Sequence, residues 1–310
     1  MNNLADVTIA ADQADAEARR AEKLRLLMRK KPKYIAEVWR VFWKNKLAVV
    51  SLAVVLFILL AALCAPLIVP YSEAIRQDVL AKFTPPGAGH PFGTDNLGRD
   101  VFSRILHGGR VSMTMGVIPT FASLLLGIVF GGAAVYCGGR VDSVVMRLCD
   151  MLSCIPGVLL ALTFVAALGP GLENVLIAVT IASVPDLTRY VRSVILNIVG
   201  LEYIDAARSC GAGGARIVAR HVIPNAAGPL ILSAVSNIAS MIMIGAGLSY
   251  LGLGIQPPNP EWGNMLAEGQ NYFTRAPYLM FAPGVVILVA VLAFNLVGDG
   301  LRDALDPKLR

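Results

Sequence analysis

One short polar segment stands out among the apolar stretches of this sequence, YIDAARSCGAGGARIVARHVIPN at residues 203–225. Its clustered glycines are compatible with a nucleotide loop, a substrate site or a docking surface for another protein. The chain contains no G-x-x-x-x-G-K-[ST] phosphate loop, GAGGAR does not satisfy G-x-G-x-x-G, and no strand pattern precedes it. We therefore do not expect this segment to bind a nucleotide itself.

Candidate catalytic and metal-binding residues are sparse. The five cysteines contain no C-x-x-C pair and lie in or near apolar stretches, which favours buried, inert thiols over a zinc or iron–sulfur site. The three histidines are scattered and contain no H-E-x-x-H motif. We predict no catalytic residue, no metal site and no cofactor bound by this chain.

Composition indicates a membrane protein. Of the 310 residues, 56% are hydrophobic and only 15% are charged, whereas soluble domains are about a quarter charged. The chain is basic, which is compatible with nucleic-acid binding. However, its Lys and Arg residues are concentrated beside apolar stretches, and this pattern favours membrane orientation instead.

Six apolar stretches are candidates to cross the ~30 Å hydrocarbon core as helices. The fourth is the weakest, because Pro185 and Asp186 interrupt it. Prolines and glycines are tolerated inside such helices because neighbouring helices satisfy the freed backbone groups, and small residues allow close packing. The predicted fold is all-α, with a six-span domain over residues 47–298 and spans at residues 47–69, 111–137, 151–168, 175–191, 226–248 and 278–297.

The distribution of basic residues orients these spans. Of the 27 Lys and Arg residues, 21 lie on the side that holds both termini and the segment at 203–225, so the positive-inside rule makes that side cytoplasmic. Residues 1–33 are predicted to be a disordered basic leader and residues 299–310 a cytoplasmic tail. Residues 34–46 have the pattern of an amphipathic helix on the membrane surface, or of a simple basic flank of the first span.

Asp186 is the strongest candidate for an intramembrane acid, since few other ionisable residues fall at mid-membrane depth. We place it near the cytoplasmic end of its helix, beside Arg189 and Arg192. There, a helix-end cap or an ion pair is the expected role. The sequence therefore gives little support to a proton-coupled carrier with a carboxylate relay.

The segment between the fourth and fifth spans is predicted to form a helix, a tight turn and a second short helix. Gly211 suits the C′ position that ends the first helix, and Gly213 and Gly214 permit a sharp turn. Pro224 can occupy the first turn of the next membrane helix. One face of the first helix carries Glu202, Asp205, Ala206, Ser209 and Gly213, with Ala206 and Ala207 keeping the surface shallow.

Arg216 and Arg220 share a face of the second helix, because they are spaced i, i+4. Small residues suit insertion into a groove on a partner protein, and the two arginines supply directional polar contacts. A merely solvated loop would leave the clustering of Gly and Ala unexplained. We therefore predict that this segment docks on another protein.

The same segment resembles the EAA loop of bacterial ABC importer permeases, whose pattern is E-A-A, three residues, Gly, nine residues and I-x-L-P. Asp205 stands in place of the Glu, and His221 stands where the first Ile is usual. The residues that match in place are Ala206, Ala207, Gly211, Ile223 and Pro224. In that family the loop, here the coupling loop at residues 194–225, holds a helix that fits a cleft in the ATPase subunit. The resemblance implies that ATP and Mg²⁺ are bound by partner ATPase subunits.

Further stretches extend the resemblance over nearly the whole chain after the leader. HPFGTDNLGRDVFSRILHGGRVSM at residues 90–113 resembles a signature of the second permease of dipeptide, oligopeptide and nickel importers, and GLGIQPPNPEWGNML and AFNLVGDGLRDALDPKLR are typical of the same family. The resemblance implies a type I ABC importer permease fold in the bacterial inner membrane. It also implies a second homologous permease, two ATPase subunits and an external binding protein as partners.

The implied cargo is dipeptides or oligopeptides. A nickel chelate or glutathione is the alternative within the family, and an ATP-independent channel or membrane scaffold is the alternative of a different class. The sequence does not identify the substrate-binding residues.

The stretches that carry the resemblance also have local physical interpretations. Thr94 is expected to cap a short helix. Trp262, in the proline-rich external loop, is expected to be an anchor at the membrane interface. The charged residues expected to form local ion pairs near Thr94 are Asp95, Arg99, Asp100 and Arg104.

Overall fold

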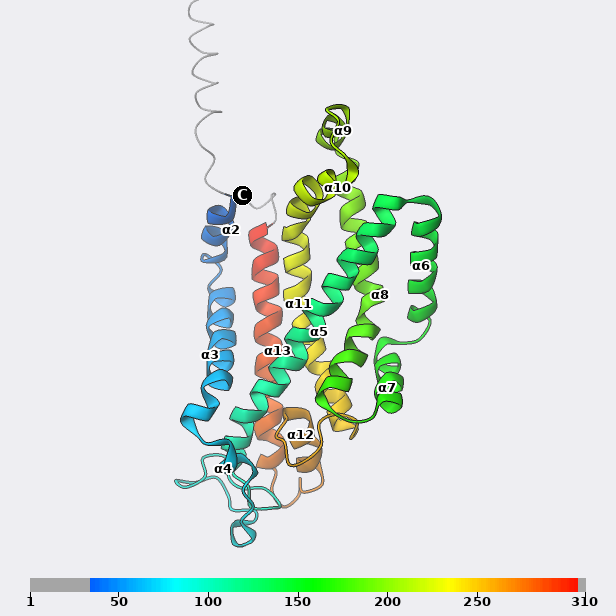
Figure 1. The fold of residues 1–310 in the computed structure, drawn as a ribbon. Coiled ribbons are helices and arrows are strands. Elements are labelled where there is room, and N and C mark those ends of the chain that lie inside the picture. Colours follow the sequence, from blue (N-terminus) through cyan, green and yellow to red (C-terminus); the bar gives the residue numbers. More distant parts are fainter. Residues whose placement is uncertain (1–33, 306–310) are drawn as a thin grey trace, which may run out of the picture.

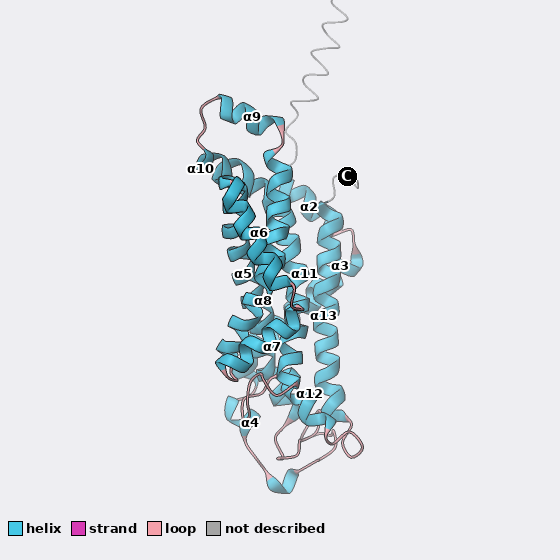
Figure 2. Ribbon diagram, turned by 90° about the vertical axis from the view of Figure 1, so that its right-hand side faces the viewer, coloured by secondary structure: helices cyan, strands magenta, loops and turns pink. Residues whose placement is uncertain are grey.

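The computed structural model describes residues 34–305, which form an all-helical bundle (Figure 1). No β-strand occurs among these residues, and one isolated bridge pairs Thr94 with Asp100. Long helices run between two ends that carry short helices and loops (Figure 2). The elements are α2 (Tyr34–Phe42), α3 (Lys46–Ile68), α4 (Tyr71–Ile75), the 3₁₀-helix η1 (Val79–Ala81), α5 (Val101–Cys137), α6 (Gly139–Ser153), α7 (Gly157–Leu168), α8 (Leu172–Val199), α9 (Glu202–Ser209), α10 (Gly214–Ile217), the π-helical turn η2 (Val218–Val222), α11 (Ile223–Tyr250), α12 (Trp262–Gln270) and α13 (Tyr278–Leu305). The all-α prediction is confirmed.

Four helices in the described part of the chain are long and apolar enough to cross a membrane: α3, α5, α11 with η2, and α13. The number rises to five if α6 and α7 together make one bent span. α8 is also long, at 28 residues, but it carries four charged side chains, Glu173, Asp186, Arg189 and Arg192. Length and composition thus support four or five of the six predicted spans, and α8 is a further helix of the bundle.

The predicted third span at residues 151–168 is not one helix. The chain breaks between α6 and α7, and the two helices are bent by 84°. Pro156 lies at this break. Proline lacks an N–H and disfavours helical conformation in the preceding residue, which explains why the helix is interrupted here. α7 alone has 12 residues, about 18 Å of helix, which is too short to cross the hydrocarbon core. The apolar run continues through a bend that composition does not reveal.

Glycines allow α5 and α8 to pack closely. A Cβ added at Gly127 would lie 3.1 Å from the carbonyl carbon of Leu187, and one added at Gly131 would lie 2.8 Å from the carbonyl oxygen of Thr188. The two glycines are spaced i, i+4, the small-xxx-small pattern that brings helix backbones together in membranes. The structure thus confirms that small residues permit close helix contact here.

Two arginines of α8 tie α6 to the bundle. Arg192 donates from Nε and Nη2 to the two carboxylate oxygens of Asp142, both at 2.6 Å. Arg189 donates to the Ser153 hydroxyl at 2.7 Å and to Asp150 at 3.3 Å. Because a bidentate arginine–carboxylate pair fixes orientation as well as distance, these contacts set how α6 lies against α8.

The two ends of the bundle carry different elements. Figure 1 shows α2, α9 and the C-terminal end of α13 at one end, and α4 and α12 at the other. α2 is held by Phe42, which packs with Ala304 of α13, whereas Trp39 and Trp43 are exposed. A helix thus covers most of the stretch at residues 34–46, and its position on a membrane surface stays a prediction.

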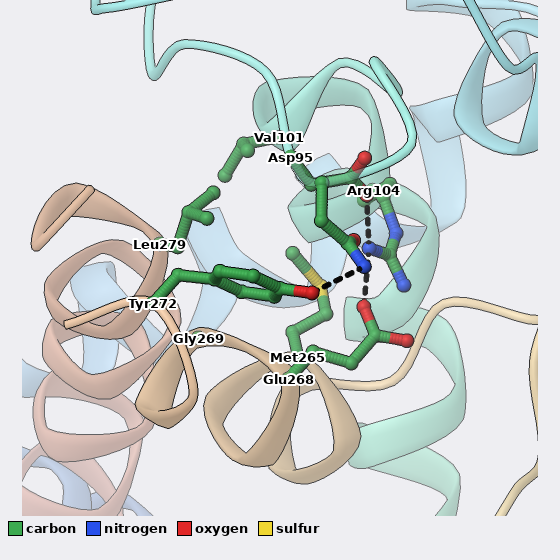
Figure 3. Close-up of a pocket in the computed structure, with 9 residues that line it drawn as sticks. Asp95, Val101, Arg104, Met265, Glu268, Gly269, Tyr272 and Leu279 are labelled. Carbon is green, nitrogen blue, oxygen red and sulfur yellow. Dashed lines mark hydrogen bonds and ion pairs between the residues drawn. The ribbon is translucent and has the colours of Figure 1, made fainter. Parts of the chain in front are cut away.

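A buried ion cluster joins the loop before α5 to α12 (Figure 3). Arg99 and Arg104 both contact Asp95 Oδ2, at 2.6 and 2.5 Å. They also share Glu268 Oε2, at 3.0 and 2.8 Å. Asp95, Arg99 and Arg104 are each no more than 3% exposed. The predicted ion pairs are confirmed for these three residues, and Glu268 is a partner that the sequence did not identify.

Two predictions for this end are wrong. Asp100, rather than Thr94, caps the helix that follows, since its Oδ2 accepts the Ser103 N–H at 2.7 Å. Trp262 is 2% exposed and donates its Nε1–H to the carbonyl oxygen of Ile105 at 2.9 Å. Glycines of α5 leave room for the Trp262 ring. The indole is therefore a core side chain and does not anchor the chain at the membrane interface.

Candidate functional site

α9 carries the first part of the predicted docking surface and protrudes from the bundle (Figures 1 and 2). Glu202, Asp205 and Ala206 are exposed, and Ala207 is half-buried. Arg208 donates to Asp205 at 3.2 Å, one turn apart on the helix surface. α9 therefore presents a shallow surface with charges at its edge, as a helix that enters a groove requires.

The turn after α9 is a Schellman motif. The φ of Gly211 is +80°. Its N–H donates to the carbonyl oxygen of Arg208 at 2.9 Å, and the N–H of Ala212 donates to that of Ala207 at 3.1 Å. These are the two hydrogen bonds that define the motif, and its C′ residue must adopt a left-handed conformation that glycine reaches without steric cost. The prediction that Gly211 occupies C′ is confirmed.

The next two glycines have a different role from the predicted one. Neither Gly213 nor Gly214 has a positive φ, so neither supplies a left-handed turn. Gly213 is exposed, with no atom close to a Cβ added there, whereas a Cβ at Gly214 would collide with the Tyr136 ring of α5. Gly214 therefore lets α10 lie close to the Tyr136 side chain of α5. The sequence could not show this, because the contact joins residues far apart in the chain.

Arg216 and Arg220 are both exposed, in α10 and in the π-helical turn η2 respectively. Within residues 34–305 neither guanidinium forms a hydrogen bond or an ion pair. Both cations are therefore free to contact a partner protein. Their positions match the prediction that the second half of the segment is basic and accessible.

A π-helical turn contains His221 and directly precedes the helical turn that holds Pro224. The Ile223 N–H donates to the carbonyl oxygen of Val218, an i to i−5 bond. Pro224 has no N–H, and its ring would crowd the carbonyl oxygen of Arg220 in a regular helix, so a wider turn relieves the conflict. His221 lies in this wider turn. Pro224 therefore lies in the first turn of α11, although that helix continues directly from η2.

Buried side chains anchor the coupling loop to the bundle. Ile204, Ile217 and Val222 belong to one core cluster with side chains of α5, α8 and α11. The Tyr203 hydroxyl accepts a hydrogen bond from Asn225 Nδ2 at 3.1 Å, which joins the two ends of the loop. These anchors were not predicted from the sequence. Their only local signal is single apolar residues placed between polar ones.

A second polar feature is a cavity of about 380 Å³ between α7, α8 and α11. Asp186 is the only charged residue among the described residues that line it. Its Oδ1 accepts a hydrogen bond from Arg189 Nη2 at 2.5 Å, which confirms the predicted ion pair. The predicted position at a helix end is wrong, because α8 continues unbroken through Pro185 and places Asp186 near its middle.

Comparison with known families supports one assignment. The family of binding-protein-dependent transport system inner membrane components matches residues 123–310. The N-terminal TM domain of oligopeptide transport permease C matches residues 33–86. The two matches together cover the N-terminal helices and the coupling loop.

Individual relatives are similar over most of their length. The di/tripeptide transport system permease protein DppC of Pseudomonas aeruginosa is 43% identical over 287 residues, which cover 90% of this chain and 94% of that protein. The glutathione transport system permease protein GsiD of Pectobacterium atrosepticum is 42% identical over 88% of this chain and 91% of its own length. The dipeptide transport system permease protein DppC of Bacillus subtilis is 38% identical over 89% of this chain and 87% of its own length.

The fold also matches a solved structure. The inward-facing MetNI methionine ABC transporter superposes with a TM-score of 0.54 at 18% identity, covering 65% of this chain and 96% of that chain. This likeness shows the type I ABC importer permease fold. The family match over residues 123–310 and the similarity to permease proteins show that the chain is a transport subunit and not itself an enzyme. The chain belongs to the family of binding-protein-dependent transport system inner membrane components, the permeases of ABC importers.

Proposed function

We propose that this chain is one of two homologous permease subunits of an importer for peptides, and that residues 202–224 dock on its ATPase subunits. The observation that carries the proposal is the protruding unit of α9, the Schellman turn and α10, which is exposed on one side and anchored by buried residues on the other. The relatives named for dipeptide or di/tripeptide transport support peptide cargo. The relative named for glutathione transport supports glutathione as a second candidate cargo.

The docking end faces the cytoplasm in this proposal. Most Lys and Arg residues flank the predicted spans on the side of the coupling loop, as the positive-inside rule requires of a cytoplasmic face. The same end of the bundle carries α2 and the end of α13 (Figure 1). The opposite end, with α4, α12 and the ion cluster, then faces the external binding protein.

The docking contact combines shape with charge. The exposed Ala206 and the half-buried Ala207 let the backbone of α9 approach a groove closely, while Asp205 and Glu202 offer acceptors at the same surface. Arg216 and Arg220 add two cations with no partner among the described residues, and arginine forms directional contacts with carboxylates. ATP and Mg²⁺ would be held by the ATPase subunits, outside this chain.

Anchoring by buried residues gives the docking contact a mechanical consequence. Ile204 of α9 packs in the same cluster as Ile217 of α10 and Val222 of η2. A displacement of α9 when the ATPases close therefore moves the adjoining ends of α8 and α11. Rocking of these helices against the second permease would alternate access between the two sides of the membrane.

Charge reversal of the two free arginines tests the docking surface. The importer, with both permeases, the ATPases and the binding protein, is purified through a tag on this chain and reconstituted in proteoliposomes. We expect Arg216→Glu with Arg220→Glu to reduce the ATPase recovered with the permeases and to reduce peptide uptake, because two attractive contacts become repulsive. The permeases should still insert and remain paired.

The control is Arg40→Glu with Arg140→Glu. It makes the same change in charge at two exposed arginines of α2 and α6, outside the coupling loop. We expect it to retain ATPase binding and uptake. The docking assignment is wrong if the coupling-loop variant binds ATPase and imports peptide to the same extent as this control. If the protein were instead a channel or a scaffold, no ATPase would be recovered even with the wild-type chain.

A further inference from the structure

We propose that the cavity between α7, α8 and α11 binds the ammonium group of the cargo, with the Asp186 carboxylate as its counter-charge. This inference rests on the proposed peptide import, and it assigns a substrate-binding site that the sequence did not identify. The cavity volume of about 380 Å³ falls within the ~300–1,000 Å³ of ordinary small-molecule sites. It is therefore large enough for a short peptide or for one end of a longer one.

The walls of the cavity carry polar groups on matching helix faces. From α8, Ser183, Asp186 and Tyr190 recur at helical spacing, and from α11 the polar residues are Ser233, Asn237 and Ser240. Small residues of α7, Gly157 and Ala161, complete the lining. A polar face on two long helices of a membrane bundle is typical of a water-filled path and not of a lipid-facing surface.

The exposure of Asp186 strengthens this interpretation. Its side chain is 80% exposed although the residue lies near the middle of the 28-residue helix α8. A charged side chain that faces lipid at the bilayer centre is energetically costly and therefore rare. Asp186 therefore faces water or a partner subunit in the assembled importer, and the cavity beside it is a place where water reaches this depth.

The local charge balance favours a cation. Asp186 and Asp150 share one guanidinium, that of Arg189, at 2.5 and 3.3 Å, so the three groups together carry a net negative charge. Arg189 also donates to Ser153 at 2.7 Å, which holds it on the α6 side of the cluster. A ligand cation that approaches Asp186 can therefore replace one contact of Arg189 without releasing the arginine from its other two partners.

Acceptors for an ammonium group remain available in the cavity. Asp186 Oδ2 forms no hydrogen bond within the part of the chain that the structure describes. Asn237 donates its amide nitrogen to Ser233, at 2.9 Å to the carbonyl oxygen and 3.2 Å to the hydroxyl, and this leaves its side-chain oxygen free to accept. An ammonium group has three N–H donors, and every peptide with a free amino terminus carries one. The geometry thus suits the amino terminus of a peptide.

Transport by the assembled importer tests the site. Proteoliposomes hold both permeases and the ATPases, and the binding protein is loaded with a neutral, a lysine-containing or a glutamate-containing dipeptide. We measure dipeptides imported per ATP hydrolysed. We expect Asp186→Asn to lower this number about tenfold, as loss of one charged hydrogen bond would, and Asp186→Glu to keep most of it. The preference for the lysine-containing over the glutamate-containing dipeptide should also fall in Asp186→Asn.

Glu173→Gln is the matched control, because it removes another exposed carboxylate of α8 that neither lines the cavity nor contacts Arg189. We expect it to import like the wild type. Wild-type transport and cargo preference in Asp186→Asn would overturn the inference, as would equal loss of assembly in Asp186→Asn and Asp186→Glu, which would indicate a structural carboxylate. If the wild-type importer takes up no dipeptide, the proposed function fails first and this inference fails with it.

Discussion

Replacing Gly211 by valine tests the docking assignment through backbone conformation alone. A Cβ at this position would meet no atom within 4 Å, so the added Cβ causes no collision. The φ of +80°, however, is one that L residues rarely adopt. The left-handed conformation costs about 1–2 kcal/mol for an ordinary residue and more for a β-branched one, whereas asparagine tolerates it better.

The size of the effect follows from the hydrogen bonds of the Schellman turn. The bonds from Gly211 to Arg208 and from Ala212 to Ala207, at 2.9 and 3.1 Å, are the ones that form the turn. Each contributes about 1 kcal/mol net, so the strain is comparable with the stabilisation of the turn. A cost of about 1.4 kcal/mol lowers the ratio of formed to unformed turn about tenfold. The apparent affinity for the ATPase then falls with the fraction of permeases whose turn is formed, because only the formed turn presents α9 correctly.

The matched control is Gly252→Val at the opposite end of the bundle. Gly252 also has a φ of +80° and open space around a Cβ. It closes a second Schellman turn, with hydrogen bonds to Ser249 and from Leu253 to Leu248, both at 3.0 Å. The two substitutions therefore impose the same strain on the same motif, one inside the coupling loop and one outside it.

The assay is titration of purified ATPase onto the reconstituted permeases, followed by peptide uptake. We expect Gly211→Val to weaken ATPase binding severalfold, by up to about tenfold, Gly211→Asn to weaken it clearly less, and Gly252→Val to bind as the wild type. Equal binding by Gly211→Val and Gly252→Val would refute the reasoning. A loss as large in Gly211→Asn as in Gly211→Val would also refute it, since strain at φ would not then be the cause.

Two further predictions concern the bundle, and thermal unfolding in detergent measures both. Glu268→Gln removes a carboxylate from the buried ion cluster and should destabilise the fold by about 3 kcal/mol, because breaking a buried pair leaves charge uncompensated. Glu73→Gln, which removes one partner of an exposed pair, should destabilise it by less than about 1 kcal/mol. Equal effects of the two substitutions would contradict this prediction. Gly131→Ala should destabilise the fold more than Gly132→Ala. The added methyl group meets a backbone oxygen at 2.8 Å in the first variant and only a side-chain methyl group at 3.9 Å in the second. The reverse order would show that the close approach of α5 and α8 does not limit stability.

Features that depend on local interactions could be predicted from the sequence. Gly211 as a C′ residue, the short helices on either side of it and the ion pair of Asp186 with Arg189 all depend on residues a few positions apart. Helix caps, i, i+3 pairs and apolar length are properties of a single stretch of chain. These features can therefore be predicted without knowing which helices become neighbours.

Features that depend on contacts between distant parts of the chain could not be predicted. Trp262 is surrounded by polar and proline residues in sequence, yet its ring lies over glycines of α5, more than a hundred positions away. Glu268 completes an ion cluster whose other members lie before or at the start of α5. The role of Gly214 is set by Tyr136 in the same way. No local pattern distinguishes such residues from exposed ones.

The cavity went unnoticed in the sequence for a related reason, and its position connects the two proposals. Its polar lining is split between α8 and α11, and each helix contributes only three polar residues to it. These are also the two helices that the coupling loop joins, through α9, α10 and η2. Because the loop is anchored by buried contacts to both, a shift of α9 reaches the two walls of the cavity without passing through another helix. The force from a docked ATPase would thus be applied to the helices that hold Asp186 and its acceptors, which is the shortest path by which docking could change the affinity for cargo.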